Sequence, residues 1–387
     1  MKKYVIVMLV LAGAVLAGCQ KEEGIPAAYT VEAEPILAPP TQEEAEPEEE
    51  TADTAVIQER TVVDGKMQSY LTGEWKDEEV ARRRSMAVMI PNNKPALPQY
   101  GLSQASMIYE APVEGRTTRL MAFFEDYDEL DRIGPVRSSR DYYVYEAMSY
   151  DAIYVNWGLA IPFVKDLINS DRVDNVSQAL EGIDRPAPEA FARVSRPGYA
   201  TEFTGYLMVK GYEEAVERLG YETRYRDRFV QAFAFANDGQ PAGYPDQPEA
   251  TKIYPGGTSA NNSGYGNANP YFEYDEDDRL YYRYQYGKAQ EDERNGEQLA
   301  VSNVVFKICH GEVREPSAKD YLAFGVHGEG EAYVFTGGRV IHGTWERDGD
   351  YGANLFLDED GDEIIFNQGK TWICNIWKEY SEYLAYE

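Results

Sequence analysis

The stretch 132–140 combines residue types that together can recognise an anion. It reads Arg-Ile-Gly-Pro-Val-Arg-Ser-Ser-Arg, so arginines and serines gather around a turn set by Gly134 and Pro135. The turn is expected to open a helix, whose free N–H groups and dipole favour negative charge at that end. Arginine adds a two-pronged donor that fits carboxylate or phosphate. The pattern therefore predicts an anion-recognising loop.

The surroundings of this loop are locally basic in an acidic chain. The chain has 387 residues, with 37 Lys and Arg against 67 Asp and Glu, and a formal net charge of −30. Five of its arginines lie between residues 116 and 140. We expect a ligand cleft at a junction between a strand and a helix. Its candidate binding residues are Arg116, Arg119, Arg137, Ser138, Ser139 and Arg140, helped by Asn92, Glu110 and Glu114, with Tyr142 and Trp157 as stacking walls.

The same residues have a purely structural interpretation. Arg119 or Arg137 could pair with Glu110 or Glu114 and pin the loops together without binding any ligand. Both interpretations stay open at this point. The ligand interpretation requires that the guanidinium groups of the loop face solvent and remain unpaired.

Glu110 and Glu114 also raise the question of glycoside hydrolysis, which uses two carboxyl groups at a set separation. Four residues apart, they would share a helical face only if the helix survived Pro112, and proline breaks a helix interior. We therefore expect a non-catalytic protein. An enzyme acting on cell-envelope polymers is kept as the alternative.

Other catalytic and metal-binding patterns are incomplete. The three histidines, at 310, 327 and 342, lie in the second half of the chain, far in sequence from Ser138 and Ser139. Cys309 and His310 lack a partner pair at zinc spacing. The stretch 358–362 imitates the start of an EF-hand loop but lacks the closing glutamate, which favours a hairpin tip. We expect neither a metal nor a cofactor.

Cysteines and tryptophans are expected to serve the core. Cys309 and Cys374 lie in apolar β runs, and we expect both to be free and buried rather than bonded to each other. Aromatic rings can stack on sugars, but they more often fill cores or form cross-strand pairs. The core is accordingly the expected place of Trp345, Trp372 and Trp377.

The N-terminus predicts a lipid anchor. Two lysines precede an apolar run at 4–16 that is too short to span a bilayer, and the run ends in Leu-Ala-Gly-Cys. This is a lipobox, in which Cys19 receives a diacylglyceryl group and becomes the new N-terminus. Two acyl chains hold a protein stably on a bilayer. We expect a protein tethered to the extracytoplasmic face of a bacterial cell membrane through the acyl chains on Cys19.

An acidic segment follows the anchor. Residues 20–60 contain twelve acidic and two basic residues together with five prolines. Such a composition cannot bury enough apolar surface to order itself, so an extended tether is predicted up to residue 72. The acidic balance of the whole chain also argues against binding nucleic acid, which needs a cationic surface.

The folded part divides by pattern into two regions. Between 73 and 245, strands are expected at 87–90, 118–124 and 151–157, alternating with helices at 104–110, 138–148, 163–168 and 204–219. From 246 to 387 the sequence consists of short apolar runs separated by turns, with hairpin signals at Gly337-Gly338 and Asp360-Gly361. We therefore predict a mixed α+β fold. An N-terminal α/β layered domain at 73–245 is followed by a smaller, mainly antiparallel β domain at 246–387.

With these segments placed, the sequence resembles a known family. The stretches Ala-Val-Met-Ile-Pro-Asn at 87–92 and Ile-Gly-Pro-Val-Arg-Ser-Ser-Arg at 133–140 are similar to the YerB-like lipoproteins. So is Asn-Gln-Gly-Lys-Thr-Trp-Ile at 367–373. These are secreted bacterial proteins grouped as a domain of unknown function, DUF3048. The resemblance implies a fold and a location outside the cytoplasm, and it implies no activity.

Together these features predict a membrane-anchored extracytoplasmic lipoprotein that binds a ligand and has no catalytic activity. Its expected ligand is an anionic small molecule or a glycan-like component of the envelope, or else an envelope protein, bound near the Arg/Ser loop. A protein–protein scaffold is a further alternative. Sequence alone does not name the ligand or the oligomeric state.

Overall fold

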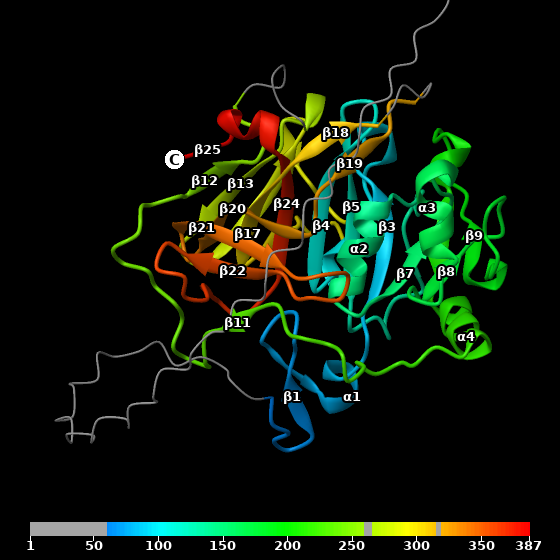
Figure 1. The fold of residues 1–387 in the computed structure, drawn as a ribbon, viewed down its shortest axis with the longest axis horizontal. Coiled ribbons are helices and arrows are strands. Elements are labelled where there is room, and N and C mark those ends of the chain that lie inside the picture. The colour runs from blue at the N-terminus through cyan, green and yellow to red at the C-terminus, as the bar shows by residue number, and fades with distance from the viewer. Residues whose placement is uncertain (1–59, 259–264, 315–318) are drawn as a thin grey trace, which may run out of the picture. The chain divides into compact units, whose positions relative to one another are not determined.

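The computed structural model describes residues 60–258, 265–314 and 319–387, and most of its regular structure is strand. Its largest element is a ten-stranded sheet (Figure 1). In order across this sheet, the strands are β22 (Leu355–Asp358), β21 (Arg339–Arg347), β20 (Gly328–Thr336), β17 (Asn303–Cys309), β24 (Thr371–Trp377), β4 (Met107–Val113), β5 (Thr117–Phe124), β3 (Met86–Pro91), β7 (Ile153–Asn156) and β8 (Asn175–Ser177).

The centre of the sheet joins the early and late parts of the chain. β24 pairs in parallel with β4, so that Thr371 lies opposite Met107 and Cys374 opposite Glu110. On its other side β24 pairs in parallel with β17. Every residue of β4 and β17 is buried, as expected of strands covered on both faces. Both halves of the sequence therefore build one sheet.

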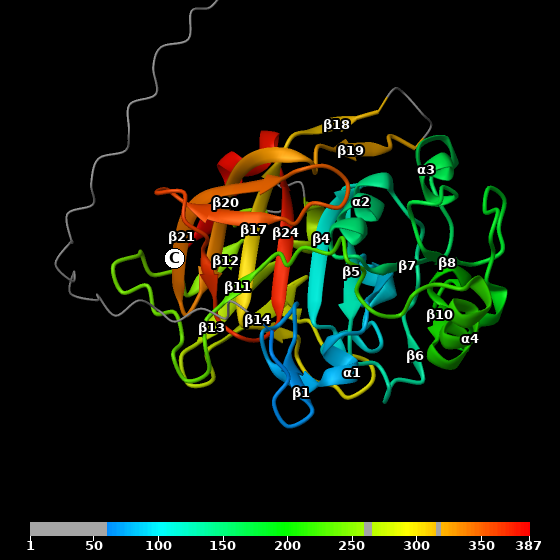
Figure 2. The ribbon, with the colours of Figure 1, turned by 60° about the horizontal axis from the view of Figure 1, so that its bottom comes forward.

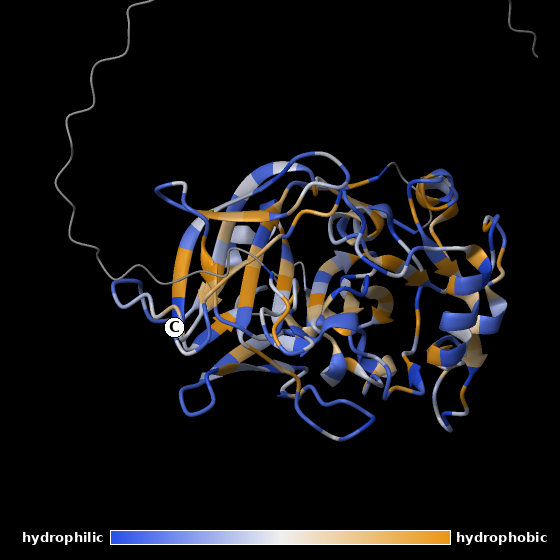
Figure 3. Cartoon of the chain, turned by 90° about the horizontal axis from the view of Figure 1, so that it is seen from below, coloured by the Kyte–Doolittle hydropathy of each residue, from blue (hydrophilic) through white to orange (hydrophobic). Residues whose placement is uncertain are grey.

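Each face of the sheet has its own hydrophobic core, because successive side chains of a strand point in opposite directions. On one face, Tyr109 and Met121 pack in a core that includes α2 (Asp141–Ser149) and α3 (Ile161–Ile168). On the other face, Ile108 packs in a core that includes α4 (Val209–Leu219). Figure 2 shows α2 and α4 on different sides of the strands, and Figure 3 shows apolar segments concentrated along the strands.

Smaller sheets and short turns complete the fold. A six-stranded sheet packs against the late strands in the second core, and its residues include Phe272 and Tyr281. Its strands are β12 (Lys252–Tyr254), β13 (Tyr271–Asp275), β14 (Leu280–Gln285), β15 (Lys288–Ala289), β16 (Ala300–Val301) and β25 (Ala385–Tyr386). The other strands are β6 (Arg132–Ile133), β9 (Phe191–Arg193), β10 (Gly205–Met208), β11 (Ala234–Phe235), β23 (Ile365–Phe366), β18 (Gly311–Val313) and β19 (Leu322–Phe324). Six 3-10 turns are present in the described ranges: η1 (Lys94–Ala96), η2 (Leu102–Gln104), η3 (Pro188–Ala190), η4 (Thr201–Phe203), η5 (Gly266–Ala268) and η6 (Lys378–Tyr383).

The structure confirms the predicted mixture of strands and helices in coarse form, with strands dominant. Two predicted helices are wrong in part. The helix expected at 104–110 is the turn η2 followed by β4, and the helix expected at 204–219 is β10 followed by α4. In β4 the apolar residues fill two opposite cores, so they do not mark a single helical face.

The folded part begins earlier than predicted. β1 (Lys66–Gln68) pairs with β2 (Trp75–Asp77), and α1 (Glu78–Ala81) follows directly. Met67 and Leu71 are fully buried, so residues 60–72 belong to the folded part and the boundary at 72 is wrong. Cys19 and the acidic stretch up to residue 59 lie outside the described residues. In the part of the chain that the structure describes, no helix is long and apolar enough to cross a membrane.

Both cysteines in the described ranges are free, as predicted, because the sheet separates them. Cys309 belongs to the core under α2, and Cys374 to the core on the opposite face. Burial raises the pKa of the Cys309 thiol to about 12, which keeps it protonated and unreactive. Trp345 and Trp372 are buried core residues, also as predicted.

The hairpin predicted at Gly337-Gly338 is confirmed. Thr336 pairs with Arg339 across the turn, and both glycines have positive φ values, 56° and 75°. Such a backbone suits glycine, which has no Cβ to clash.

Candidate functional site

The arginines of the predicted loop are occupied by protein groups. Two nitrogens of Arg140 donate to the carboxylate of Glu114, and Arg119 lies 3.6 Å from the same carboxylate. Arg119 also donates to the carbonyl of Ser138 at 2.6 Å. Burial, with the neighbouring charge of Arg140, lowers the pKa of Arg119 to about 10. Glu114 is thus shared by two of the predicted ligand-binding cations, and its single charge balances one of them.

The remaining arginines of the loop also have partners. Arg137 donates to the Glu202 carboxylate at 2.7 Å, at a partly exposed site, and its guanidinium lies over the Phe203 ring. Arg116 stands in the exposed turn between β4 and β5 and has an interaction of its own. The expectation that these guanidinium groups stay unpaired is therefore wrong for Arg119, Arg137 and Arg140, because carboxylates lie within reach of each.

Ser139 and Tyr142 are buried in the protein, whereas Ser138 and Trp157 are only partly buried and are joined by a hydrogen bond from the Ser138 hydroxyl to the Trp157 carbonyl at 3.4 Å. Ser139 is fully buried and accepts a hydrogen bond from Tyr154 at 3.0 Å. Tyr142 is buried and donates to the Pro112 carbonyl at 2.8 Å. Trp157 packs edge-on against Phe191. Arg140 is the N-cap of α2, and no side chain caps this helix end.

Asn92 and Glu110 belong to a different cluster, fully buried where the two halves of the chain meet. Glu110 accepts hydrogen bonds from Asn92 at 3.0 Å and from Thr118 at 2.7 Å. It also accepts from Arg283 at 2.7 Å and from Trp372 at 3.0 Å, both contributed by the late part of the chain. Arg283 and Glu110 are completely buried. Sequence analysis missed Arg283, although it occupies an inward position in the alternating pattern of β14.

The structure thus separates the predicted set into two groups. Glu114 gathers Arg119 and Arg140 near the start of α2, whereas Asn92 and Glu110 lie in the buried cluster with Arg283. Glu110 and Glu114 do not act as a facing pair, since each carboxylate is held by its own arginine. No group of three or more His, Cys, Asp or Glu side chains in the described ranges could hold a metal ion.

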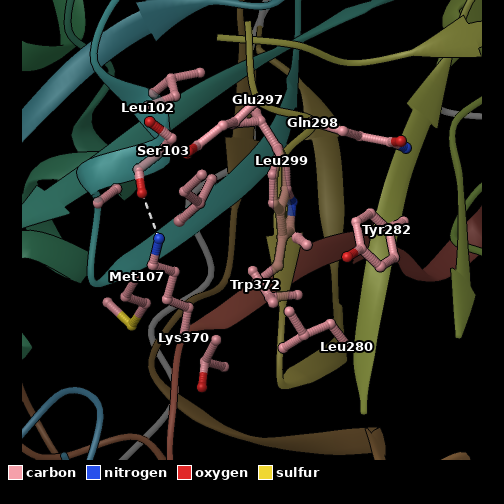
Figure 4. A pocket seen from close by; sticks show the side chains of 15 residues that line it. Leu102, Ser103, Met107, Leu280, Tyr282, Glu297, Gln298, Leu299, Lys370 and Trp372 are labelled. Atoms are coloured by element: carbon pink, nitrogen blue, oxygen red, sulfur yellow. Dashed lines mark hydrogen bonds between the residues drawn. The ribbon is translucent and has the colours of Figure 1, made fainter. Parts of the chain in front are cut away.

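A pocket of about 360 Å³ lies beside the buried cluster, between the early and late parts of the chain (Figure 4). Its walls come from the turn η2 and β4 on one side and from β14, β16 and the start of β24 on the other. The lining side chains are largely apolar. They are Leu102, Ser103, Ala105, Met107, Ile108, Leu280, Tyr282, Glu297, Gln298, Leu299, Ala300, Val301, Lys370, Thr371 and Trp372.

Lys370 is the only basic residue in the wall of this pocket. Its ammonium donates to the carbonyl of Ser103, shown as the dashed line in Figure 4. Within the described ranges, no carboxylate lies within 4 Å of it to form a salt bridge. Burial lowers the pKa of Lys370, which reflects the cost of holding a charge next to apolar side chains. Sequence analysis missed Lys370. The only sign of it in the sequence was its place directly before the apolar run that forms β24.

The wall of the pocket is fixed by a carboxylate from the late part of the chain. Asp292 accepts hydrogen bonds from the backbone N–H groups of Gly101 at 2.9 Å and of Ser103 at 2.7 Å. Asn295 donates to the Ser103 hydroxyl at 3.2 Å. The buried Trp372, held by its bond to Glu110, lines the pocket from inside. The pocket is therefore preformed rather than built by a loop closing.

Comparison with known proteins places the pocket between two family domains. Residues 71–222 match the model described as "Protein of unknown function (DUF3048) N-terminal domain", and residues 261–373 match that of the corresponding C-terminal domain. η2 and β4 lie in the first match, and β14, β16 and the start of β24 in the second. The boundary that we predicted near 245 falls between the two matches and stays a prediction.

Two further comparisons concern one relative. The chain is 27% identical over 311 residues to "Putative lipoprotein YerB" of Bacillus subtilis (strain 168), covering 80% of this chain and 86% of the relative. The crystal structure of YerB from Bacillus subtilis superposes with a TM-score of 0.65 at 24% identity. The match covers 81% of this chain and 98% of that one, which shows a shared fold.

Proposed function

We propose, from the premise that this chain belongs to the DUF3048 family, that it is a lipid-anchored extracytoplasmic binding protein. Its ligand site is the pocket between the two family domains, rather than the Arg/Ser loop. The name of the relative YerB and the lipobox ending at Cys19 support the anchor. The pocket supports the binding role, because a preformed, mainly apolar hollow with few polar groups is typical of small-molecule sites.

The observation that carries the proposal is the ammonium of Lys370, which lines an apolar hollow without a carboxylate partner in the described ranges. A buried charge normally has a counter-ion, because desolvation is costly. A ligand that carries one acidic group would supply it. The apolar side chains of Leu102, Met107 and Leu299 would cover the rest of that ligand. We therefore propose a small amphipathic acid as the ligand class.

The positions of Glu110 and Glu114 do not support the alternative of an enzyme that acts on envelope polymers. Glu110 is fully buried behind Trp372, where a polymer cannot reach it. Glu114 is paired with Arg140.

Binding of three probes of equal chain length tests the proposal: hexanoate, hexanol and hexylamine, each titrated into the folded chain and followed by calorimetry and by melting temperature. Hexanoate is expected to bind most tightly, and hexylamine least. Lys370→Met keeps the length of the side chain and removes its charge, so it should weaken hexanoate binding about tenfold and leave hexanol unchanged, since a charged hydrogen bond contributes about 1.5–3 kcal/mol.

Lys288→Met is the matched control, because Lys288 is exposed on β15 and does not line the pocket. It should bind hexanoate as the unaltered chain does. Hexanoate binding that survives Lys370→Met, or equal binding of all three probes, would contradict the proposal. Melting of each variant without ligand separates a lost site from a damaged fold.

A further inference from the structure

A second pocket lies where several loops meet at one end of the large sheet. It has a volume of about 330 Å³. Its walls come from the segment 236–241, the turn between β13 and β14, the turn between β20 and β21, and the turn between β23 and β24. Loops gathered on a rigid sheet are the usual place for binding residues. Its lining includes Asn237, Asp278, Arg279, Ser302, Asn367 and Gln368.

Arg279 is exceptional among the arginines of this protein. Within residues 60–258, 265–314 and 319–387, every other arginine side chain has an ion pair, a hydrogen bond or a ring contact. The guanidinium of Arg279 has none of these. Arg185 and Arg193 also lack a carboxylate partner, but both donate hydrogen bonds to carbonyl oxygens, whereas Arg279 does not.

Two of the four acidic residues that precede Arg279 accept hydrogen bonds from other groups. Asp278 accepts hydrogen bonds from the Leu280 N–H and from the Tyr282 hydroxyl. Asp275 accepts from the Asp277 N–H at 2.9 Å. Arg279 itself has a left-handed backbone conformation at the end of this turn, with a φ of 63°. Within the described ranges, no carboxylate lies close enough to its guanidinium to form a salt bridge.

Asn367, which lines this pocket, has an unused hydrogen-bond acceptor. The Asn367 amide nitrogen donates to Ala242 at 3.1 Å and to Thr336 at 2.8 Å, whereas its buried Oδ1 has no hydrogen-bond partner. A buried polar atom without a partner costs free energy, so it marks a place for a donor. A Cβ added to Gly337 would lie 3.4 Å from the Asn367 amide nitrogen and 3.9 Å from a guanidinium nitrogen of Arg279. Both groups therefore approach the same glycine.

We propose that this pocket, the Arg279 pocket, binds a small hydroxylated carboxylate such as a sugar acid. The guanidinium fork pairs with the carboxylate, and the Asn367 Oδ1 accepts from a ligand hydroxyl. The pocket holds one cation next to the acidic turn 275–278, so a single negative charge fits better than the double charge of phosphate. The site is separate from the Lys370 pocket and does not depend on it.

Titrations of the folded chain with four probes test this inference by ligand-observed NMR at low salt: glucuronate, glucose, acetate and inorganic phosphate. Glucuronate has both recognised groups and is expected to bind at least fivefold more tightly than each of the others. Arg279→Gln should weaken glucuronate binding about tenfold. Because Arg279 is exposed and unpaired, this substitution should leave the melting temperature unchanged.

Two variants act as controls. Arg172→Gln removes an exposed arginine that is paired with Asp350, and Lys370→Met alters the other pocket. Arg172→Gln is expected to bind glucuronate like the unaltered chain. Lys370→Met should lose hexanoate binding and keep glucuronate binding, although the Lys370 carbonyl accepts a hydrogen bond from Ser302, which lines the Arg279 pocket. The inference is overturned if glucuronate does not bind at millimolar concentration, if it binds Arg279→Gln equally well, or if glucose or phosphate binds as tightly. A result in which only hexanoate fails to bind would contradict the proposal for the Lys370 pocket and not the inference for the Arg279 pocket. Failures at the two pockets are therefore distinguishable.

Discussion

At the residue scale, the buried pair of Glu110 and Arg283 shows how the two halves of the chain depend on each other. Both side chains are fully buried, and two further nitrogens of Arg283 lack a hydrogen-bond partner. Such a pair is costly to desolvate and more costly to break, because the remaining charge stays buried alone. The bond between Glu110 and Trp372 links this pair to the wall of the Lys370 pocket.

We expect Glu110→Gln to lower the free energy of unfolding by about 3–5 kcal/mol, since it removes the counter-charge of Arg283 while keeping the shape of the side chain. Urea unfolding monitored by circular dichroism measures this change. Glu202→Gln is the control, because it breaks the partly exposed pair with Arg137 and should cost less than about 1 kcal/mol. Equal effects of the two substitutions would contradict the importance assigned to the buried pair.

The pKa values of His342 and His327 are shifted in opposite directions, which gives a testable prediction. Hydrogen bonds to Glu359 and Glu331 raise the pKa of His342 above 6.5, against a smaller effect of burial. Burial and the charge of Arg347 lower the pKa of His327. An NMR titration should show His342 gaining its proton at higher pH than His327. The chain has only three histidines, so their signals can be assigned with single substitutions.

The raised pKa of His342 also fixes the sign of its effect on stability. The charged form is favoured in the folded state, so its contribution is complete below pH 6.5 and is lost as pH rises through the folded pKa. His342→Gln should therefore reduce the fall in melting temperature over that range. An unchanged pH profile in this variant would contradict the ion pairing with Glu331 and Glu359.

At the scale of elements, the sequence predicts the positions of strands and turns better than it predicts which side chains pair with one another. The strand at 87–90, the helix after Ser139 and the hairpin at Gly337-Gly338 follow from local patterns and are present in the structure. β4 was mistaken for a helix because both of its faces are buried, which removes the alternation that identifies a strand.

The same limit applies to the candidate site. The arginine-rich loop is visible in the sequence, but the partner of Arg137 is Glu202, 65 residues away. Arg279 stands next to four acidic residues in sequence and yet pairs with none of them. Pairing of side chains depends on the tertiary arrangement, so neither outcome could be deduced from local spacing.

A glycine in α4 provides a prediction at this scale. Alanine normally stabilises a helix relative to glycine by about 1 kcal/mol. At Gly211, however, an added Cβ would lie 2.1 Å from the carbonyl oxygen of Glu189, where η3 crosses the helix. We therefore expect Gly211→Ala to destabilise the protein by about 1–3 kcal/mol, the usual cost of overpacking.

Thermal and urea unfolding of Gly211→Ala would measure this effect. Lys210→Ala, at the exposed neighbouring position of the same helix, should stay within about 0.5 kcal/mol of the unaltered chain. A stabilised Gly211→Ala variant would mean that α4 and η3 are further apart than the structure has them.

At the scale of the whole molecule, the two family domains are not separate bodies. β24, in the region of the C-terminal model, is inserted between β17 and β4, and β4 belongs to the region of the N-terminal model. The described residues, 60–258, 265–314 and 319–387, accordingly belong to a single compact unit. Of the strands that line the Lys370 pocket, β4 and β24 therefore cannot move apart without breaking the large sheet. β14 and β16 belong to the six-stranded sheet, which is held to the early part of the chain by the bond between Arg283 and Glu110 and by the bonds of Asp292 to Gly101 and Ser103. These contacts favour a ligand that fits a fixed shape.

The proposed position of this protein in the cell rests on one residue, Cys19. If acyl chains on its sulfur attach the protein, each buried methylene contributes about 0.8 kcal/mol, and two chains hold the protein through a high-salt wash. We expect the unaltered chain to remain in the membrane fraction and Cys19→Ser to appear in the soluble or secreted fraction. Mass spectrometry of the N-terminal peptide should find a diacylglyceryl group on Cys19.

A Cys19→Ser chain that still stays in the membrane fraction after the high-salt wash would show a different attachment. Because Cys19 precedes the described residues in sequence, the melting temperature and the hexanoate binding of the Cys19→Ser chain are expected to stay unchanged. This expectation separates an error about the anchor from an error about the pocket.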